Sequence, residues 1–172
     1  MSDRPIENQD AKNYIANVSI HGIAHDTQWI IDVGRFPVGC CVLDVGSGTG
    51  TLAYALANQE IFHRSIRGVD LSHDLVLHAR KQWKLPNLHF SESDFLDYEL
   101  PLGWNPDTIV MSFYLHHCEE HSAHLSRAAE LLPHGGRLYV FDRIAINDDA
   151  KVEFYRFWES EYRDAHEWRE NL

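Results

Sequence analysis

The 172-residue sequence lacks any apolar run of the roughly 20 residues that a membrane-spanning helix requires. Its first residues are polar, and no apolar segment typical of a secretory signal follows them. It contains only three cysteines, of which Cys40 and Cys41 are adjacent, so no disulfide framework is predicted. These absences predict a cytoplasmic protein without a membrane partner.

Basic residues are few as well: 15 Lys and Arg stand against 26 Asp and Glu, which gives a formal net charge of -11. A surface this acidic repels phosphate backbones, so we expect no nucleic-acid partner. The 44% of hydrophobic and 24% of charged residues are typical of a globular domain, which excludes a disordered or collagen-like chain. A small molecule is the partner that this composition favours.

Short apolar runs alternate with segments of helical periodicity along the chain. Strands are expected at residues 41–45, 65–70, 88–90, 108–113 and 137–141, and helices at 8–18, 22–34, 51–58, 72–83, 119–132 and 148–172. This alternation predicts an α/β fold, a Rossmann-like doubly wound and mainly parallel sheet of about five strands with flanking helices. Ligands bind such sheets beyond the carboxyl ends of the strands, so residues that follow strands are the candidate site.

The segment Asp44–Gly50 (DVGSGTG) joins the first expected strand to a helix. Its glycines allow a tight turn and let a ligand approach backbone N–H groups closely. The spacing G-x-G-x-G departs from the dinucleotide fingerprint G-x-G-x-x-G, because Thr51 takes the position of the last glycine. Asp44 inside the strand would repel a pyrophosphate and suits a cationic ligand. An NAD-linked oxidoreductase is therefore disfavoured.

Two further acidic residues follow strands. Asp70 ends the second strand and can accept hydrogen bonds from both hydroxyls of a ribose. The alternative is that Asp70 only caps the next helix, for which Ser72 is better placed. After the third strand, Asp94 can accept from an adenine amino group and Phe95 can lie against the ring, although an ordinary acidic loop is the alternative reading there.

Five segments in succession, VLDVGSGTG, GVDLS, SDF, DTIVMSFYLHH and LLPHGGRLYVFD, resemble the motifs of class I S-adenosylmethionine-dependent methyltransferases over residues 40–142. The chain looks most similar to the small-molecule type, which includes the quinone-biosynthesis methyltransferases. The resemblance implies an enzyme that transfers a methyl group from S-adenosylmethionine to a small-molecule acceptor. The alternative is a regulator or partner subunit of the same fold that binds the cofactor without catalysis.

The resemblance also implies roles for individual residues. Asp44 would lie near the amino group of the cofactor, the glycine loop along its methionine part, and Met111 and Ser112 on the side of its sulfonium. The residues that it implies in cofactor binding are Tyr14, Asp44, Gly46, Ser47, Gly48, Gly50, Asp70, Leu71, Asp94, Phe95, Met111 and Ser112.

Residues 1–36 are expected to form a helical lid over the pocket of an S-adenosylmethionine-binding domain, residues 37–172. From this lid, Tyr14 would touch the methionine carboxylate. The family's sheet usually ends in an antiparallel pair of strands, and the pattern after the fifth expected strand is helical instead. We therefore expect this pair to be lacking, and the edge of the fifth strand to be covered by the last helix or by a second copy in a homodimer.

Histidines cluster after the fourth expected strand. His117 is the candidate catalytic base, because an imidazole titrates near neutrality and can take a proton from an acceptor hydroxyl. Its alternatives are packing against the cofactor or capping the next helix. His117, His121 and His124 follow an i, i+4, i+7 spacing that would suit zinc. Solvent-facing histidines are common, however, and we expect no metal.

Overall fold

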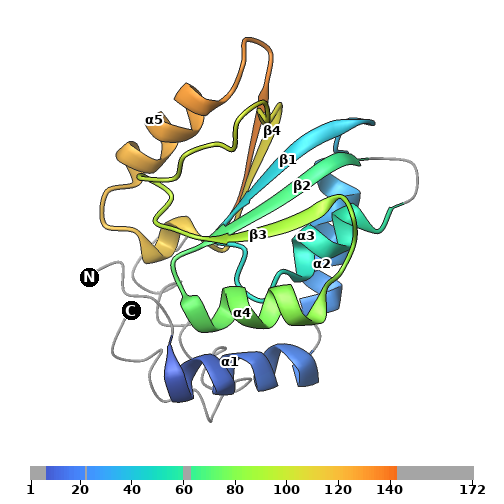
Figure 1. Ribbon diagram of the computed structural model, residues 1–172, viewed down its shortest axis with the longest axis vertical. Coiled ribbons are helices and arrows are strands. Elements are labelled where there is room, and N and C mark those ends of the chain that lie inside the picture. The colour runs from blue at the N-terminus through green and yellow to red at the C-terminus, as the bar shows by residue number, and fades with distance from the viewer. Residues whose placement is uncertain (1–6, 22, 60–62, 143–172) are drawn as a thin grey trace, which may run out of the picture.

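The computed structural model describes residues 7–21, 23–59 and 63–142. One parallel sheet of five strands, in the order β3-β2-β1-β4-β5, forms its centre (Figure 1). The strands are β1 (Cys40–Val45), β2 (His63–Asp70), β3 (Leu88–Glu92), β4 (Thr108–Ser112) and β5 (Arg137–Phe141). The order reverses between β1 and β4, which is the feature that defines a doubly wound sheet. The predicted fold class is confirmed.

Helices cover both faces of the sheet, with α5 on one face and the other α-helices on the opposite side (Figure 1). They are α1 (Asn8–His21), α2 (Ile23–Gly34), α3 (Thr51–Ala57), α4 (His73–Gln82) and α5 (His121–Leu131), with a short 3-10 helix, η1 (Leu115–His117), before α5. Each agrees with an expected helix within a few residues, except η1, which was not expected. None of these helices is long and apolar enough to cross a bilayer. The helix expected from residue 148 lies outside the described residues.

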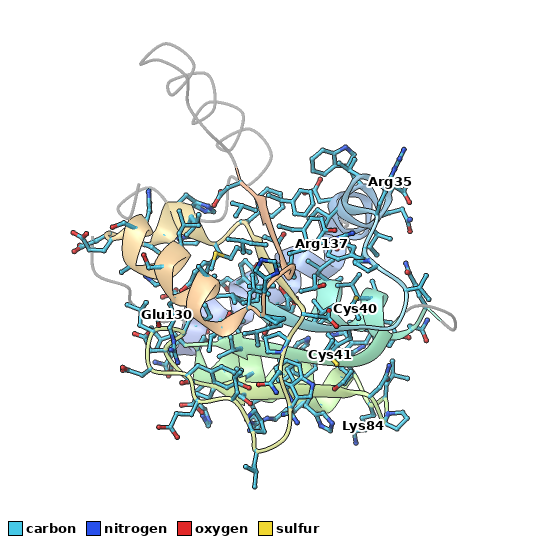
Figure 2. The ribbon with its side chains drawn as sticks, turned by 90° about the horizontal axis from the view of Figure 1, so that it is seen from above. Arg35, Cys40, Cys41, Lys84, Glu130 and Arg137 are labelled. Atoms are coloured by element: carbon cyan, nitrogen blue, oxygen red, sulfur yellow. The ribbon has the colours of Figure 1, made fainter. Side chains whose placement is uncertain are left out.

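Strand β1 is buried on both faces, which explains its nearly continuous apolar sequence. Val42 packs with Leu56 of α3 in one core, whereas Leu43 packs with Ile109 and with Ala128 of α5 in the other. The strands begin together at one edge, where Figure 2 labels Cys40, Cys41 and Arg137. Their carboxyl ends therefore meet at the opposite edge, where the functional site is expected.

Gly50, the residue before α3, shows how closely the glycine loop approaches the sheet. Its φ is +77°, a left-handed conformation that side chains rarely adopt. A Cβ at this position would lie 2.5 Å from the Phe90 ring and 3.0 Å from the Cβ of Ala79. Both the backbone conformation and the space therefore require glycine at the point where β1 turns into α3.

The substitution Gly50→Ala should lower the free energy of unfolding by about 2–4 kcal/mol, since left-handed strain and overpacking add. Gly103→Ala is the matched control: its φ of +78° is equally strained, but a Cβ there meets nothing within 4 Å, so about 1 kcal/mol is expected. Urea denaturation of both variants measures the difference. Equal losses of unfolding free energy in the two variants would show that the side chains of Phe90 and Ala79 move aside at little cost. Packing would then not require glycine at position 50.

Candidate functional site

The glycine loop between β1 and α3 is held against the end of β2 by backbone hydrogen bonds. The N–H groups of Gly46 and Ser47 both donate to the carbonyl oxygen of Val69, at 2.9 and 3.1 Å. The Gly50 N–H closes a turn by donating to the Ser47 carbonyl at 2.8 Å. This places the loop beside the point where the strand order reverses, as the sequence predicts for a ligand site.

Asp70 joins the glycine loop to the start of α4. Its Oδ2 accepts the Gly48 N–H at 2.7 Å, and its Oδ1 accepts the Ser72 N–H at 2.8 Å. Burial raises the pKa of this carboxyl, whereas the two N–H groups oppose the rise. Ser72 is the N-cap of α4 and accepts the Leu75 N–H, so capping alone does not account for Asp70. Each carboxylate oxygen can still accept a second hydrogen bond, for example from a ribose hydroxyl.

Asp44 is the charged residue within β1, and only 2% of its surface is exposed. Burial, and after it the charge of Asp70, raises the pKa of Asp44 to about 8, although a hydrogen bond from the Ala53 backbone N–H lowers it. Its Oδ2 has no hydrogen-bond partner among the described residues. A buried acceptor without a donor is unfavourable, and a cationic or N–H-bearing ligand would correct this.

Two tyrosines approach the glycine loop from different elements. A Cβ on Gly48 would lie 3.6 Å from Oη of Tyr14, which comes from α1. A Cβ on Gly46 would lie 2.4 Å from Cδ2 of Tyr114, which follows β4. The structure thus brings Tyr14 to the predicted loop, and it adds Tyr114, which the sequence analysis did not single out. The function of residues 1–36 as a lid stays a prediction.

The other residues predicted to bind cofactor differ in their surroundings. Asp94 Oδ1 accepts the Leu96 N–H at 2.8 Å, which forms a local turn. The Phe95 ring is buried, edge-on to Tyr114, and Met111 is fully buried in the core beneath α5. The half-buried residues at the ends of strands or in the loop are Ser47, Leu71 and Ser112. Their contacts with a cofactor stay predictions.

The histidines after β4 do not lie on one helix. His117 belongs to η1, His121 is exposed at the start of α5, and buried His124 has its Nδ1 2.8 Å from Oη of Tyr114. Burial, and then the neighbouring His116, lowers the pKa of His117 to about 4, despite the opposing charge of Asp142. Within residues 7–21, 23–59 and 63–142, no group of three His, Cys, Asp or Glu side chains could hold a metal ion. The spacing that suggested zinc therefore does not produce a site there.

His116 forms a contact that the sequence analysis missed. Its Nδ1 lies 2.7 Å from Oδ1 of Asp142, and its backbone N–H donates to Oδ2 of the same carboxylate at 3.1 Å. The sequence offered one indication of this contact, namely where the two residues stand: Asp142 directly follows β5, and His116 lies shortly after β4. Both residues therefore lie at the carboxyl edge of the sheet, where chemistry is expected.

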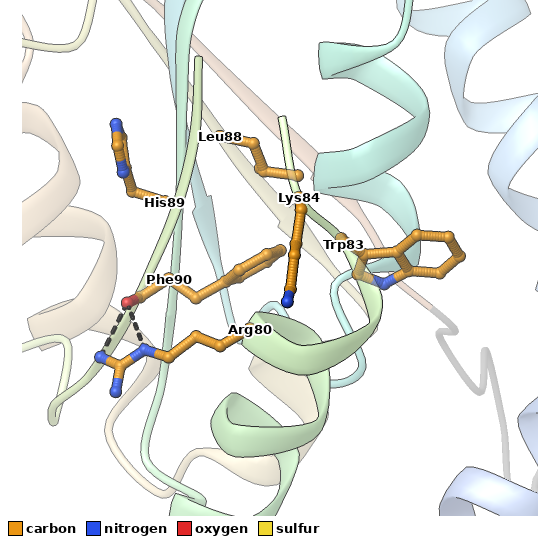
Figure 3. Close-up of a pocket in the computed structure, with 6 residues that line it drawn as sticks. All are labelled: Arg80, Trp83, Lys84, Leu88, His89 and Phe90. Atoms are coloured by element: carbon orange, nitrogen blue, oxygen red, sulfur yellow. Dashed lines mark hydrogen bonds between the residues drawn. The ribbon is translucent and has the colours of Figure 1, made fainter. Parts of the chain in front are cut away.

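A shallow hollow of about 390 Å³ lies elsewhere, between the end of α4 and the edge strand β3 (Figure 3). Arg80 crosses this edge and donates two hydrogen bonds to the Phe90 carbonyl, at 3.0 and 2.8 Å. The hollow is lined by the first residues of β3, and two of its lining side chains also reach the glycine loop: Trp83 donates to the Thr49 carbonyl, and the Phe90 ring lies against Gly50. Its lining residues are Arg80, Trp83, Lys84, Leu88, His89 and Phe90.

Comparison with known proteins identifies the family to which this site belongs. Residues 42–136, more than half of the chain, match the model of the methyltransferase domain. The chain belongs to this family. It is 32% identical over 112 residues to an uncharacterized methyltransferase of Bacillus cereus and to one of Bacillus anthracis, a match that covers 63% of this chain and 50% of each relative. The chain thus spans about half the length of the curated relatives it matches.

Solved structures share the fold. A protein of Methanococcus maripaludis has a TM-score of 0.69 at 22% identity, over 100% of this chain and 80% of that one. A TehB-like methyltransferase of Corynebacterium glutamicum has a TM-score of 0.61 at 22% identity, over 85% and 81%. Membership of the methyltransferase-domain family implies S-adenosylmethionine as the cofactor. The acidic residues around the glycine loop fit it, because the partnerless Asp44 oxygen suits a cation and Asp70 suits a ribose.

Replacing Asp44 by Asn should make the cofactor-free methyltransferase domain less sensitive to alkaline pH. The folded protein keeps the Asp44 proton up to about pH 8, whereas an unperturbed Asp loses it near 3.8. The folded state therefore binds more protons in this window, and its stability falls as the pH rises through it. The Tm of Asp44→Asn relative to wild type should rise by about 3 °C or more between pH 5.5 and 8.5. Thermal melts measure this, with the exposed-acid variant Asp97→Asn as the control; a constant difference for Asp44→Asn would contradict the assignment.

Proposed function

We propose that this protein transfers the methyl group of S-adenosylmethionine to a small-molecule acceptor. The observation that supports this most is a pair of acids beside the glycine loop, buried Asp44 and half-buried Asp70. Burial and the charge of Asp70 make the ionisation of Asp44 unfavourable until a positive ligand arrives, and a sulfonium nucleoside supplies both a positive charge and ribose hydroxyls. A dinucleotide would bring phosphate charge to the same acids and increase the repulsion.

In this proposal the chain positions the donor and keeps water away, because the methyl group of a sulfonium is already activated. Asp44 receives the ammonium of the cofactor, Asp70 the ribose, and Asp94 the adenine amino group. Ser47, Leu71, Phe95, Met111 and Ser112 complete the pocket, and Tyr14 approaches the methionine carboxylate from the lid. Support comes from the closeness of Tyr14 to Gly48 and from the position of these residues at strand ends.

The kind of acceptor is also part of the proposal. The net charge of -11 favours a small molecule over a nucleic acid, and a quinone-type acceptor follows only from the resemblance of the motifs. A cytoplasmic location is in keeping with the three cysteines, none of which forms a disulfide. A homodimer that covers the edge of β5 remains part of the proposal. A non-catalytic cofactor-binding subunit is the alternative that the experiments below separate.

Binding of S-adenosylmethionine and S-adenosylhomocysteine by the wild-type protein is the first expected result, measured by isothermal titration calorimetry. Asp70→Ala should weaken it by about 1–3 kcal/mol, roughly 5- to 150-fold in Kd, because the hydrogen bonds to the ribose are lost. Asp97→Ala, which removes an exposed carboxyl of the same acidic stretch, should leave Kd unchanged.

Several outcomes would contradict the proposal. An unchanged affinity of Asp70→Ala would remove this residue from the site, and wild-type protein that binds neither ligand at high micromolar concentration would exclude the function itself. Tight binding of NADH in a fluorescence titration would favour an oxidoreductase. Binding without transfer of labelled methyl groups to any metabolite of a panel would favour the regulatory subunit.

A further inference from the structure

The segment after β4 has the geometry of a positioned catalytic group. Phe113 adopts φ +53°, a left-handed conformation that is strained for an aromatic residue, and it turns the chain out of the strand. Its N–H donates to the Phe141 carbonyl at 2.8 Å, so the strained turn is attached to β5. Strain of this kind persists only where the surrounding structure enforces it, and it is enriched at active sites.

Tyr114 connects this segment to the glycine loop. Its ring lies where a Cβ of Gly46 would be, and its Oη is 2.8 Å from Nδ1 of buried His124 on α5. The next residues form η1, whose His116 therefore follows within one short turn of a residue that touches the loop. His116 thus lies two residues along the chain from the ring that packs on the glycine loop.

The Asp142 carboxylate orients the His116 ring. One oxygen accepts the backbone N–H of His116 and the other lies 2.7 Å from its Nδ1, so main chain and side chain are held by one group. An ionised carboxylate can only accept a hydrogen bond, so Nδ1 carries a proton, and in the neutral imidazole Nε2 then keeps the lone pair. The Asp142 side chain is 9% exposed and that of His116 26%, so the ring keeps access to a ligand while the carboxylate is shielded.

From this arrangement we infer that His116 is the general base of the reaction, that Asp142 is its positioning residue, and that the acceptor is a hydroxyl group of a small molecule. The inference rests on the proposed function. The neighbour of His116, His117, is the base predicted from the sequence; it is exposed, and desolvation followed by the charge of His116 lowers its pKa. The structure therefore moves the candidate by one residue.

The acceptor class follows from the need for a base. An aromatic amine is neutral near pH 7 and attacks with its own lone pair, and a thiol ionises near pH 8.5 without help, whereas a hydroxyl titrates at about 10 or above. When bound, S-adenosylmethionine supplies the methyl group: the acceptor oxygen bonds to the methyl carbon, the carbon–sulfur bond breaks, and its electron pair stays on sulfur. His116 takes the hydroxyl proton at Nε2, shares the resulting positive charge with Asp142, and then releases the proton to solvent.

The first test measures the tautomer of the His116 imidazole in the cofactor-free protein. Long-range ¹⁵N–¹H NMR of the full chain, with the His116 signals assigned through His116→Gln, should show the Nδ1–H tautomer at pH 8. Asp142→Asn should reduce this preference, while the exposed-histidine variant His134→Gln should leave the His116 signals in place. A wild-type Nε2–H tautomer would overturn the inference, because Nε2 could then not accept a proton.

The second test measures transfer of labelled methyl groups to a catechol, a sugar, an aromatic amine and a thiol. His116→Gln should lower kcat on the hydroxyl probes by about 10²- to 10⁴-fold while calorimetry shows wild-type affinity for S-adenosylmethionine. Asp142→Asn should also lower kcat on the hydroxyl probes while KM and the affinity for S-adenosylmethionine stay near wild type, because the ring loses the carboxylate 2.7 Å from its Nδ1.

The outcomes separate this inference from the function on which it rests. Wild-type protein that fails to bind S-adenosylmethionine contradicts the proposed function. If His116→Gln methylates the hydroxyl probes as fast as wild type, only the role of His116 is overturned. The same holds if His117→Gln alone loses this activity. Methylation of the amine or the thiol alone overturns the acceptor class.

Discussion

The carboxylate of Asp70 is the interaction on which the rest of the site depends. It accepts one N–H from the glycine loop after β1, 22 residues earlier in the chain, and one from the start of α4, so it joins two turns that follow neighbouring strands. Because parallel strands place their carboxyl ends at one edge, a single side chain at the end of β2 can reach both turns. The loop is thereby held in its left-handed glycine conformations before any ligand binds.

This arrangement places an electrostatically unfavourable group beside the loop. Asp44 lies under the loop with one unsatisfied oxygen, and the charge of Asp70 makes its ionisation still less favourable. A protein that only needed a stable turn would gain from an apolar residue at position 44, since an unpartnered buried carboxyl is destabilising. The two acids are therefore best explained by a cationic ligand. On the other side of β1, Tyr114, His116 and Asp142 extend the same edge toward β5.

Much of the fold and part of the site were predictable from sequence. The alternation of buried strands with helices predicted the sheet, and the caps and glycines placed α3 and α4 within a residue or two. Local motifs identified the glycine loop and Asp70, and the resemblance to the family placed Tyr14 near this loop, where the structure also has it. Periodicity failed for the histidines, because η1 ends at His117 and α5 begins later, so the i, i+4, i+7 spacing does not describe one helix.

The sequence alone determined the family, the order of its elements and the acids that follow its strands, because each of these is encoded in short contiguous segments. Only the tertiary structure decided that His116 is paired with Asp142. These residues are 26 positions apart on two strand ends, and no local pattern reports which of two adjacent imidazoles points toward a distant carboxylate. The strained turn at Phe113 and the packing of Tyr114 on Gly46 directly precede η1, and both involve segments that are distant in the sequence.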